Sequence, residues 1–147
     1  MHGAGTINNI ITRKLGGEEK EYYELSLSSN GMVVLIPVES AIDIGIRHIL
    51  SKVSMEKMLL SFTDIIPETN SNWNKRYREN MQRIKSGDLR EVAYVIKSLI
   101  ECDKKKSLST GERKMLRSAK QIIISEIIYS LGLSSDEAEI KLSQVLA

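Results

Sequence analysis

The feature that most constrains the fold is a change of hydrophobic periodicity near the middle of the 147-residue chain. Up to about residue 50, apolar side chains alternate with polar ones, as they do in a strand that buries one face. From about residue 71 onward they recur every three or four positions, as they do along one face of an amphipathic helix. The sequence therefore predicts an α+β protein, with a β-rich front module followed by a helical module.

The front module contains three β-rich runs, "GTINNIIT", "KEYYELSLS" and "GMVVLIPV". Gly16 and Gly17 separate the first two runs, and Asn30–Gly31, which readily adopts the positive φ angles of a tight hairpin, separates the last two. Pro37 cannot donate to a ladder and is expected at a strand end or edge. In "ESAIDIGIRHIL" we expect a helical turn, a glycine break and a short strand. The module is predicted to be a small antiparallel sheet, curved into a barrel.

The helical module is predicted from four amphipathic segments: "WNKRYRENMQRIK", "LREVAYVIKSLIECDKK", "GERKMLRSAKQIIISEIIYSLG" and "SDEAEIKLSQVL". Helix starts are marked by three pairs with capping-box spacing: Asp88 with Glu91, Ser109 with Glu112, and Ser134 with Glu137. Before these segments, "SMEKMLLSF" is expected to be a short connecting helix, and "PETNSN" a linker. The predicted division is residues 1–50, a connecting helix and linker at 51–70, and a helical domain at 71–147.

The charge distribution also differs between the two modules. Residues 1–66 carry 6 Lys/Arg and 8 Asp/Glu, a net charge of −2, whereas residues 72–120 carry 14 Lys/Arg and 6 Asp/Glu, a net charge of +8. Such asymmetry suggests modules with different partners, the basic one suited to nucleic acid. The alternative is that the basic residues only solvate helix faces.

Other residues argue against catalysis, metal binding and membrane insertion. His2 and His48 are far apart and have no ligand-type neighbours, so no metal site is expected. "GAG" at residues 3–5 lacks the third glycine and the strand-to-helix setting of a dinucleotide fingerprint. A lone cysteine, Cys102, suits a reducing cytoplasm, and no apolar run is long enough to span a membrane. We expect a cytoplasmic, non-enzymatic protein without a cofactor or a small-molecule substrate.

Trp73 is the most informative single residue, because it is the only tryptophan and is followed by Lys75, Arg76 and Arg78. On a helix it begins an apolar stripe that continues through Tyr77, Met81 and Ile84, which favours burial. Its position at the outermost turn, beside three cations, favours a base-stacking or groove-wedging side chain instead. The spacing alone leaves both interpretations open.

The chain resembles the CarD (CdnL) family of bacterial transcription regulators. The resemblance is carried by "HGAGTI", "EKEYYELSL", "IPVESAIDIGIR", "NWNKRYREN", "KSGD" and "LSTGERKMLRSAKQIIISEI", which follow the family order over nearly the whole chain. It implies that residues 1–50 form a Tudor-like barrel, similar to the polymerase-binding domain of the transcription-repair coupling factor, which docks on the β subunit of RNA polymerase. Arg13 matches a polymerase-contacting arginine of some members, and Leu35 occupies a position where some carry a second arginine.

The resemblance also implies a role for the helical domain at promoter DNA near the minus-ten element. The position of Trp73 matches a tryptophan that inserts into the minor groove at the upstream edge of the melted bubble. Lys75, Arg76 and Arg78 would then hold phosphates, as in a nucleoid-associated factor that stabilises the open promoter complex. Whether such a factor activates or represses depends on the promoter.

One departure from the family concerns the first strand. Members carry a "GD…VVYP" segment before "HGAG", so we expect the barrel here to lack that strand and to leave an edge open to pairing, including with a second copy. The competing hypothesis for function is a protein-interaction adaptor that binds polymerase or another partner without a DNA contact.

Overall fold

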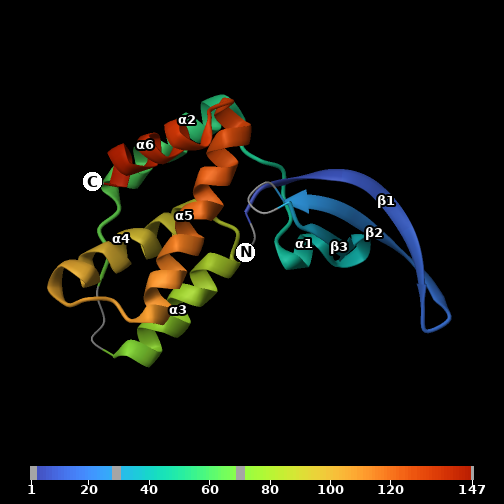
Figure 1. Cartoon of the computed structure of the whole chain (residues 1–147), viewed down its shortest axis with the longest axis horizontal. Helices are drawn as coiled ribbons and strands as arrows, with labels where there is room; N and C mark the ends of the chain where they lie inside the picture. Colours follow the sequence, from blue (N-terminus) through green and yellow to red (C-terminus); the bar gives the residue numbers. More distant parts are fainter. Residues whose placement is uncertain (1–2, 28–30, 69–71, 147) are drawn as a thin grey trace.

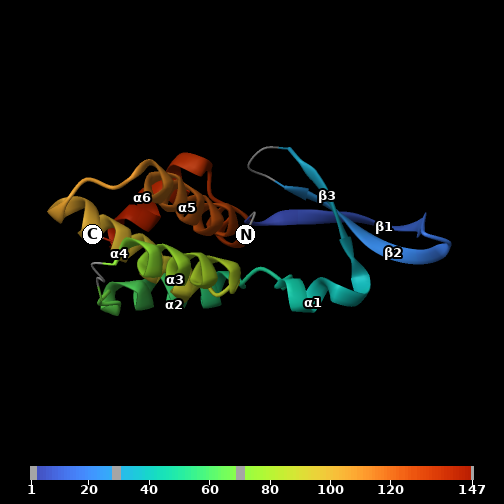
Figure 2. The same cartoon turned by 90° about the horizontal axis from the view of Figure 1, so that it is seen from below.

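The computed structural model describes residues 3–27, 31–68 and 72–146. A three-stranded sheet projects from one side of a bundle of helices (Figure 1), and the turned view shows the two modules side by side along the longest axis (Figure 2). The α+β class predicted from the two periodicities is confirmed.

The sheet is antiparallel, in the order β1-β2-β3. Its strands are β1 (Gly5–Leu15), β2 (Glu18–Leu27) and β3 (Val33–Pro37). Leu15 pairs with Glu18, so Gly16 and Gly17 form a two-residue turn with φ angles of 61° and 85°, which confirms the first hairpin. The second connection is closed by a hydrogen bond from the Leu27 N–H to the Met32 carbonyl, while Asn30 of the predicted turn lies outside the described residues.

The described strands form an open sheet rather than a closed barrel. Within the described part of the chain, β1 and β3 each pair only with β2, which leaves an outer edge on both. Leu27 is the one strand residue with a described side chain that is fully buried. The sheet therefore contributes little to the core and presents most of its side chains at the surface.

The chain leaves the sheet through η1 (Val38–Ser40) and α1 (Ala41–Ile44), and turns at Gly45, whose φ is 101°. Residues 46–51 then run without regular structure, so the prediction of a short strand here was wrong. The physical reason is that two Leu50 backbone groups bond to side chains of a helix: its N–H donates to Glu126, and its carbonyl accepts from Ser130.

The helical module contains α2 (Lys52–Ser61), η2 (Phe62–Asp64), α3 (Trp73–Lys85), α4 (Leu89–Lys105), α5 (Thr110–Leu131) and α6 (Ser135–Leu146). The four long helices expected from the sequence are confirmed. The segment ahead of them does more than connect: Met55 and Leu59 of α2 and Phe62 of η2 are buried in the same cluster as the residues of α4 and α5. The helical core therefore begins within residues 51–70, ahead of residue 71.

The core lies between α4 and α5. Its fully buried members include Val92, Val95, Ile96, Leu99, Ile123 and Ile127. Burying a side chain of this size stabilises the fold by about 1.5–3 kcal/mol. Because this cluster contains no residue of the sheet, the stability of the protein resides mainly in the helices.

Two of the predicted capping pairs differ in what their side chains bind. Ser134 and Glu137 form a reciprocal capping box, each side chain accepting from the other's N–H. Ser109 accepts from the Glu112 N–H, but the Glu112 carboxylate points instead to Arg76 of α3. The capping sequence of α5 therefore also builds a contact between helices.

Candidate nucleic-acid interface

Trp73 is the first residue of α3 and is held in place although it lies at the surface. Its side chain is 42% exposed, and its ring stacks on Tyr77 with centroids 5.1 Å apart and planes 22° from parallel. The indole Nε1 donates to the Ser109 Oγ at 3.3 Å. Stacking and a hydrogen bond together restrict the ring, so α3 presents a large aromatic side chain in one orientation.

The apolar stripe of α3 runs from the core to the surface. Ile84 is buried, Met81 and Tyr77 are half-buried against the core, and Trp73 is exposed. The predicted stripe is thus present, and Trp73 continues it beyond the point where the core ends. In Figure 1, α3 begins on the side of the helices away from the sheet.

Arg76 joins α3, the helix that carries Trp73, to α5. Its guanidinium makes two hydrogen bonds of 2.9 Å to the carboxylate of Glu112, and the two side chains are 16% and 2% exposed. These hydrogen bonds raise the pKa of Arg76 above its ordinary value, so its guanidinium stays charged. The sequence grouped Arg76 with phosphate ligands, whereas in the structure its guanidinium joins α3 to α5.

Lys75 and Arg78 differ from Arg76. Both are exposed, and within the described residues neither forms an ion pair. The Asn72 Oδ1 caps α3 by accepting from the Lys75 backbone N–H, and the Lys75 ammonium takes no part in this contact. These two cations therefore remain available for phosphates.

Three further cations lie near the start of α5, the helix whose N-cap Ser109 contacts Trp73: Arg113, Lys114 and Arg117 are exposed. They were missed as site residues, although "GERKMLR" contains them in one short stretch. The contact that brings the start of their helix to Trp73 is the one between Trp73 and Ser109, which are 36 positions apart. The exposed ring is therefore held between α3 and the N-cap of α5, two helices that both carry exposed cations.

Arg13 and Leu35 lie on the sheet and are both exposed. Arg13 pairs with Lys20 and Leu35 with Glu24; since Lys20 and Glu24 are four positions apart on β2, all four residues share one face. The structure thus brings Arg13 and Leu35 to one face of the sheet, from its opposite edges.

No second type of site competes with these surfaces in the described part of the chain. Residues 3–27, 31–68 and 72–146 contain no group of His, Cys, Asp or Glu that could hold a metal ion, and no helix that could span a membrane. A hollow of about 300 Å³ lies where the modules meet, lined by Arg47, Leu50, Met58, Ser86, Gly87, Asp88 and Leu89. Its charged side chains are engaged, Arg47 with Glu126 and Asp88 with the Arg90 N–H.

Comparisons with known proteins identify the family of the chain. Residues 57–143 match the family model "CarD, C-terminal domain", and residues 1–50 match "CarD-like/TRCF RID domain". The chain is also similar to the "Putative transcription factor YdeB" of Bacillus subtilis (strain 168), with 31% identity over 137 residues, covering 93% of this chain and 90% of the relative. A family match over more than half of the chain and this similarity over almost all of it lead to one conclusion: the chain belongs to the CarD family of transcription regulators.

Proposed function

We propose that this protein regulates transcription initiation by binding the β subunit of RNA polymerase through its sheet and stabilising the open promoter complex with Trp73. In this proposal Trp73 enters the minor groove at the upstream edge of the melted minus-ten element. The protein acts without catalysis at the promoter DNA of the nucleoid, and it tethers itself to the polymerase.

The observation that carries the proposal is the state of Trp73, which is exposed but restrained by Tyr77 and Ser109. A side chain that separates bases has to offset a few kcal/mol of lost stacking. A ring already fixed in position loses less conformational entropy on insertion than a freely rotating one. The stacked Trp73–Tyr77 pair, supported by the core, suits this task.

Besides insertion of Trp73, contacts between cations and phosphates contribute to the free energy of DNA binding. Lys75 and Arg78 are exposed on α3, and Arg113, Lys114 and Arg117 are exposed on α5, the helix whose N-cap Ser109 contacts the ring. Such contacts position a protein on DNA without reading its sequence. We therefore expect activity at many promoters, and we leave Arg76 out of the phosphate contacts because Glu112 engages its guanidinium.

Binding to polymerase is supported by the match of residues 1–50 to the CarD-like/TRCF RID domain and by the exposed face that carries Arg13 and Leu35. Tethering raises the local concentration of the helical module at the promoter, so weak DNA contacts suffice. Only a preference for melted over closed DNA can shift the equilibrium, and a wedge provides that preference because it occupies an opened step.

The test is the lifetime of the open complex formed by a bacterial RNA polymerase, compared for the parent protein and Trp73→Ala. A matched control is Tyr129→Ala, since Tyr129 is an aromatic side chain of α5 with a similar exposure of 40%. We expect the parent and the Tyr129 variant to lengthen the lifetime and the Trp73 variant to fail. Binding of each variant to polymerase is measured in parallel.

If all three proteins bind polymerase and lengthen the lifetime equally, the wedge is refuted. The adaptor hypothesis, in which the protein binds polymerase without contacting DNA, would then explain the chain better. Loss of polymerase binding on exchanging Arg13 for Glu would still support the docking face in that case.

A further inference from the structure

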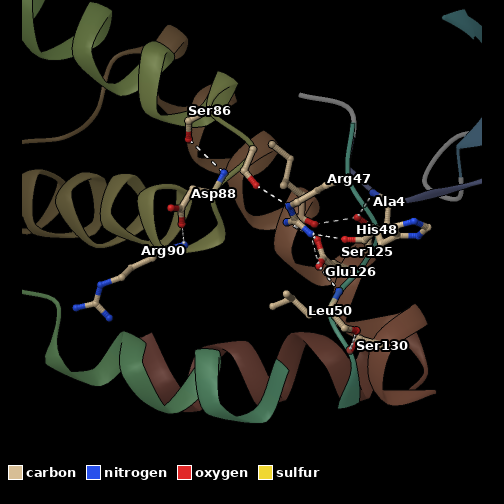
Figure 3. A network of polar contacts seen from close by, with 12 residues as sticks. Ala4, Arg47, His48, Leu50, Ser86, Asp88, Arg90, Ser125, Glu126 and Ser130 are labelled. Atoms are coloured by element: carbon tan, nitrogen blue, oxygen red, sulfur yellow. Dashed lines mark hydrogen bonds and ion pairs between the residues drawn. The ribbon is translucent and has the colours of Figure 1, made fainter. Parts of the chain in front are cut away.

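Within the described residues, most hydrogen bonds that join the sheet and the segment leaving it to the helices fall on the C-terminal half of α5. The Ala4 N–H donates to Ser125 at 2.8 Å, Arg47 and Leu50 bond to Glu126, and Ser130 donates to the Leu50 carbonyl at 2.6 Å. Figure 3 shows these side chains converging on the chain segment that leaves the sheet. We call Arg47, Leu50, Glu126 and Ser130 the junction network.

Glu126 is the centre of the junction network. Its carboxylate accepts hydrogen bonds of 2.9 and 2.8 Å from Arg47 and one of 3.0 Å from the Leu50 N–H. The side chain is only 7% exposed, whereas that of Arg47 is 38% exposed. A buried carboxylate with three donors tolerates few other arrangements, because moving any donor away leaves charge unpaired in the interior.

Arg47 extends the network to a second helix. Its Nε donates to the Gly87 carbonyl at 3.1 Å, in the turn between α3 and α4 (Figure 3). The guanidinium is thus held at the same time by α5 and by the turn that ends α3. Because a lysine ammonium lacks this planar set of donors, Arg47→Lys would retain the charge but lose the geometry.

The same helix supports the exposed tryptophan at its other end. Glu112, near the start of α5, pairs with Arg76 beneath Trp73, and Glu126 lies 14 positions further along. At 1.5 Å per residue this separation is about 21 Å along one helix. α5 therefore connects the support of Trp73 to the attachment of the sheet.

We propose that Arg47 and Glu126 are positioning residues that hold the sheet at one orientation relative to α5, and so set the reach from the docked sheet to Trp73. This inference rests on the proposed function, since the reach matters only if the sheet binds polymerase while Trp73 binds DNA. Two sites on one protein are engaged together only if the span between them fits. Loosening the junction network therefore weakens the wedge without changing Trp73 or the docking face.

The first measurement is the distance between spin labels on the two modules, by pulsed electron resonance. Labels are attached to Glu19→Cys on the sheet and Ser118→Cys on α5, both exposed positions, in a Cys102→Ser background. We compare the parent with Glu126→Gln and Arg47→Ala. Glu91→Gln is the matched control, because Glu91 pairs with Arg83 inside the helical module, away from the sheet.

We expect one narrow distance distribution for the parent and the Glu91 variant, and a broad one for both junction variants, with Arg47→Lys in between. Open-complex lifetime should be shortened for the junction variants although they bind polymerase like the parent. An unchanged distance distribution in both junction variants would overturn the proposal, and so would a broadened one with an unchanged lifetime in a promoter assay where Trp73→Ala fails.

The two proposals fail in different ways. If Trp73→Ala leaves the lifetime unchanged, the wedge is wrong whatever the distances show. The distances still report whether Arg47 and Glu126 orient the sheet. Urea unfolding of each variant shows whether the helical core is still folded, and so distinguishes a released sheet from an unfolded protein. If Glu126→Gln does not fold, the test is made with Arg47→Ala, which removes a partly exposed side chain.

Discussion

The ion pair between Arg76 and Glu112 allows a sharp test of what an arginine next to Trp73 does. We expect Arg76→Met alone to lower the free energy of unfolding by about 3–5 kcal/mol, because it leaves the Glu112 carboxylate, 2% exposed, without its partner. Glu112→Leu alone should cost a similar amount, since Arg76 is only 16% exposed. Two independent losses would sum to about 6–10 kcal/mol.

In the double variant, however, no charge is left unpaired. Replacing a buried ion pair with apolar side chains of similar volume is often neutral or stabilising by about 1–4 kcal/mol. We therefore expect Arg76→Met with Glu112→Leu to be at least as stable as the parent. Urea unfolding followed by far-UV circular dichroism measures all four proteins, and additive losses in the double variant would refute the reasoning.

The same double variant also tests whether Arg76 contacts DNA or only stabilises the packing of α3 on α5. It removes the Arg76 charge, and we expect it to stay folded. Each phosphate contact to duplex DNA contributes about 0.9 to the slope of log affinity against log salt concentration. We expect the slope for duplex DNA, measured at low salt, to match that of the parent. A slope reduced by about 0.9 would show that Arg76 contacts a phosphate after all.

Three further predictions concern separate parts of the molecule. Lys75→Ala and Arg78→Ala should each reduce the salt slope of duplex binding by about 0.9, and an unchanged slope would exclude that residue from the phosphate contacts. Phe62→Ala should lower the free energy of unfolding by about 3–5 kcal/mol, since its side chain is fully buried; a loss below about 1 kcal/mol would place η2 outside the core. Gly3→Ala should increase hydrogen exchange at the Ala4 amide, because Gly3 has a φ of 85° and a Cβ there would lie 2.6 Å from the Ser125 Oγ; unchanged exchange would contradict the tight packing of this segment on α5.

The helices could be predicted from sequence because their signals are local. Periodicity and capping residues place α3 and α4 at the residues where the structure has them, and the stripe from Trp73 to Ile84 is visible as a spacing. The same signals understated α2. Met55, Leu59 and Phe62 recur at helical spacing, but the segment is short and weakly amphipathic, so burial against α4 and α5 decides its place.

Partners distant in sequence could not be predicted in this way. Nothing near Arg76 shows that its guanidinium meets Glu112, and a cation beside Lys75 and Arg78 has the same local pattern whether it is paired or free. The motif "GAG" is a similar case. Gly3 lies against Ser125, and Gly5 begins β1 where a Cβ would clash with the Ser26 carbonyl, so both glycines allow close contacts that only the fold creates.

The two buried glutamates of α5 indicate that apolar packing and ion pairs have different roles in this protein: the first stabilises the fold, and the second orients its parts. Apolar packing between α4 and α5 stabilises the helices, but it does not determine how a sheet outside the core is placed. Buried ion pairs contribute little net stability, yet each tolerates few geometries, which suits them to select one arrangement among several of similar energy. Glu112 does this for α3 beneath Trp73, and Glu126 for the segment leaving the sheet. In the proposed function, where polymerase and DNA are bound at once, fixing that arrangement in advance would reduce the entropy lost on binding both.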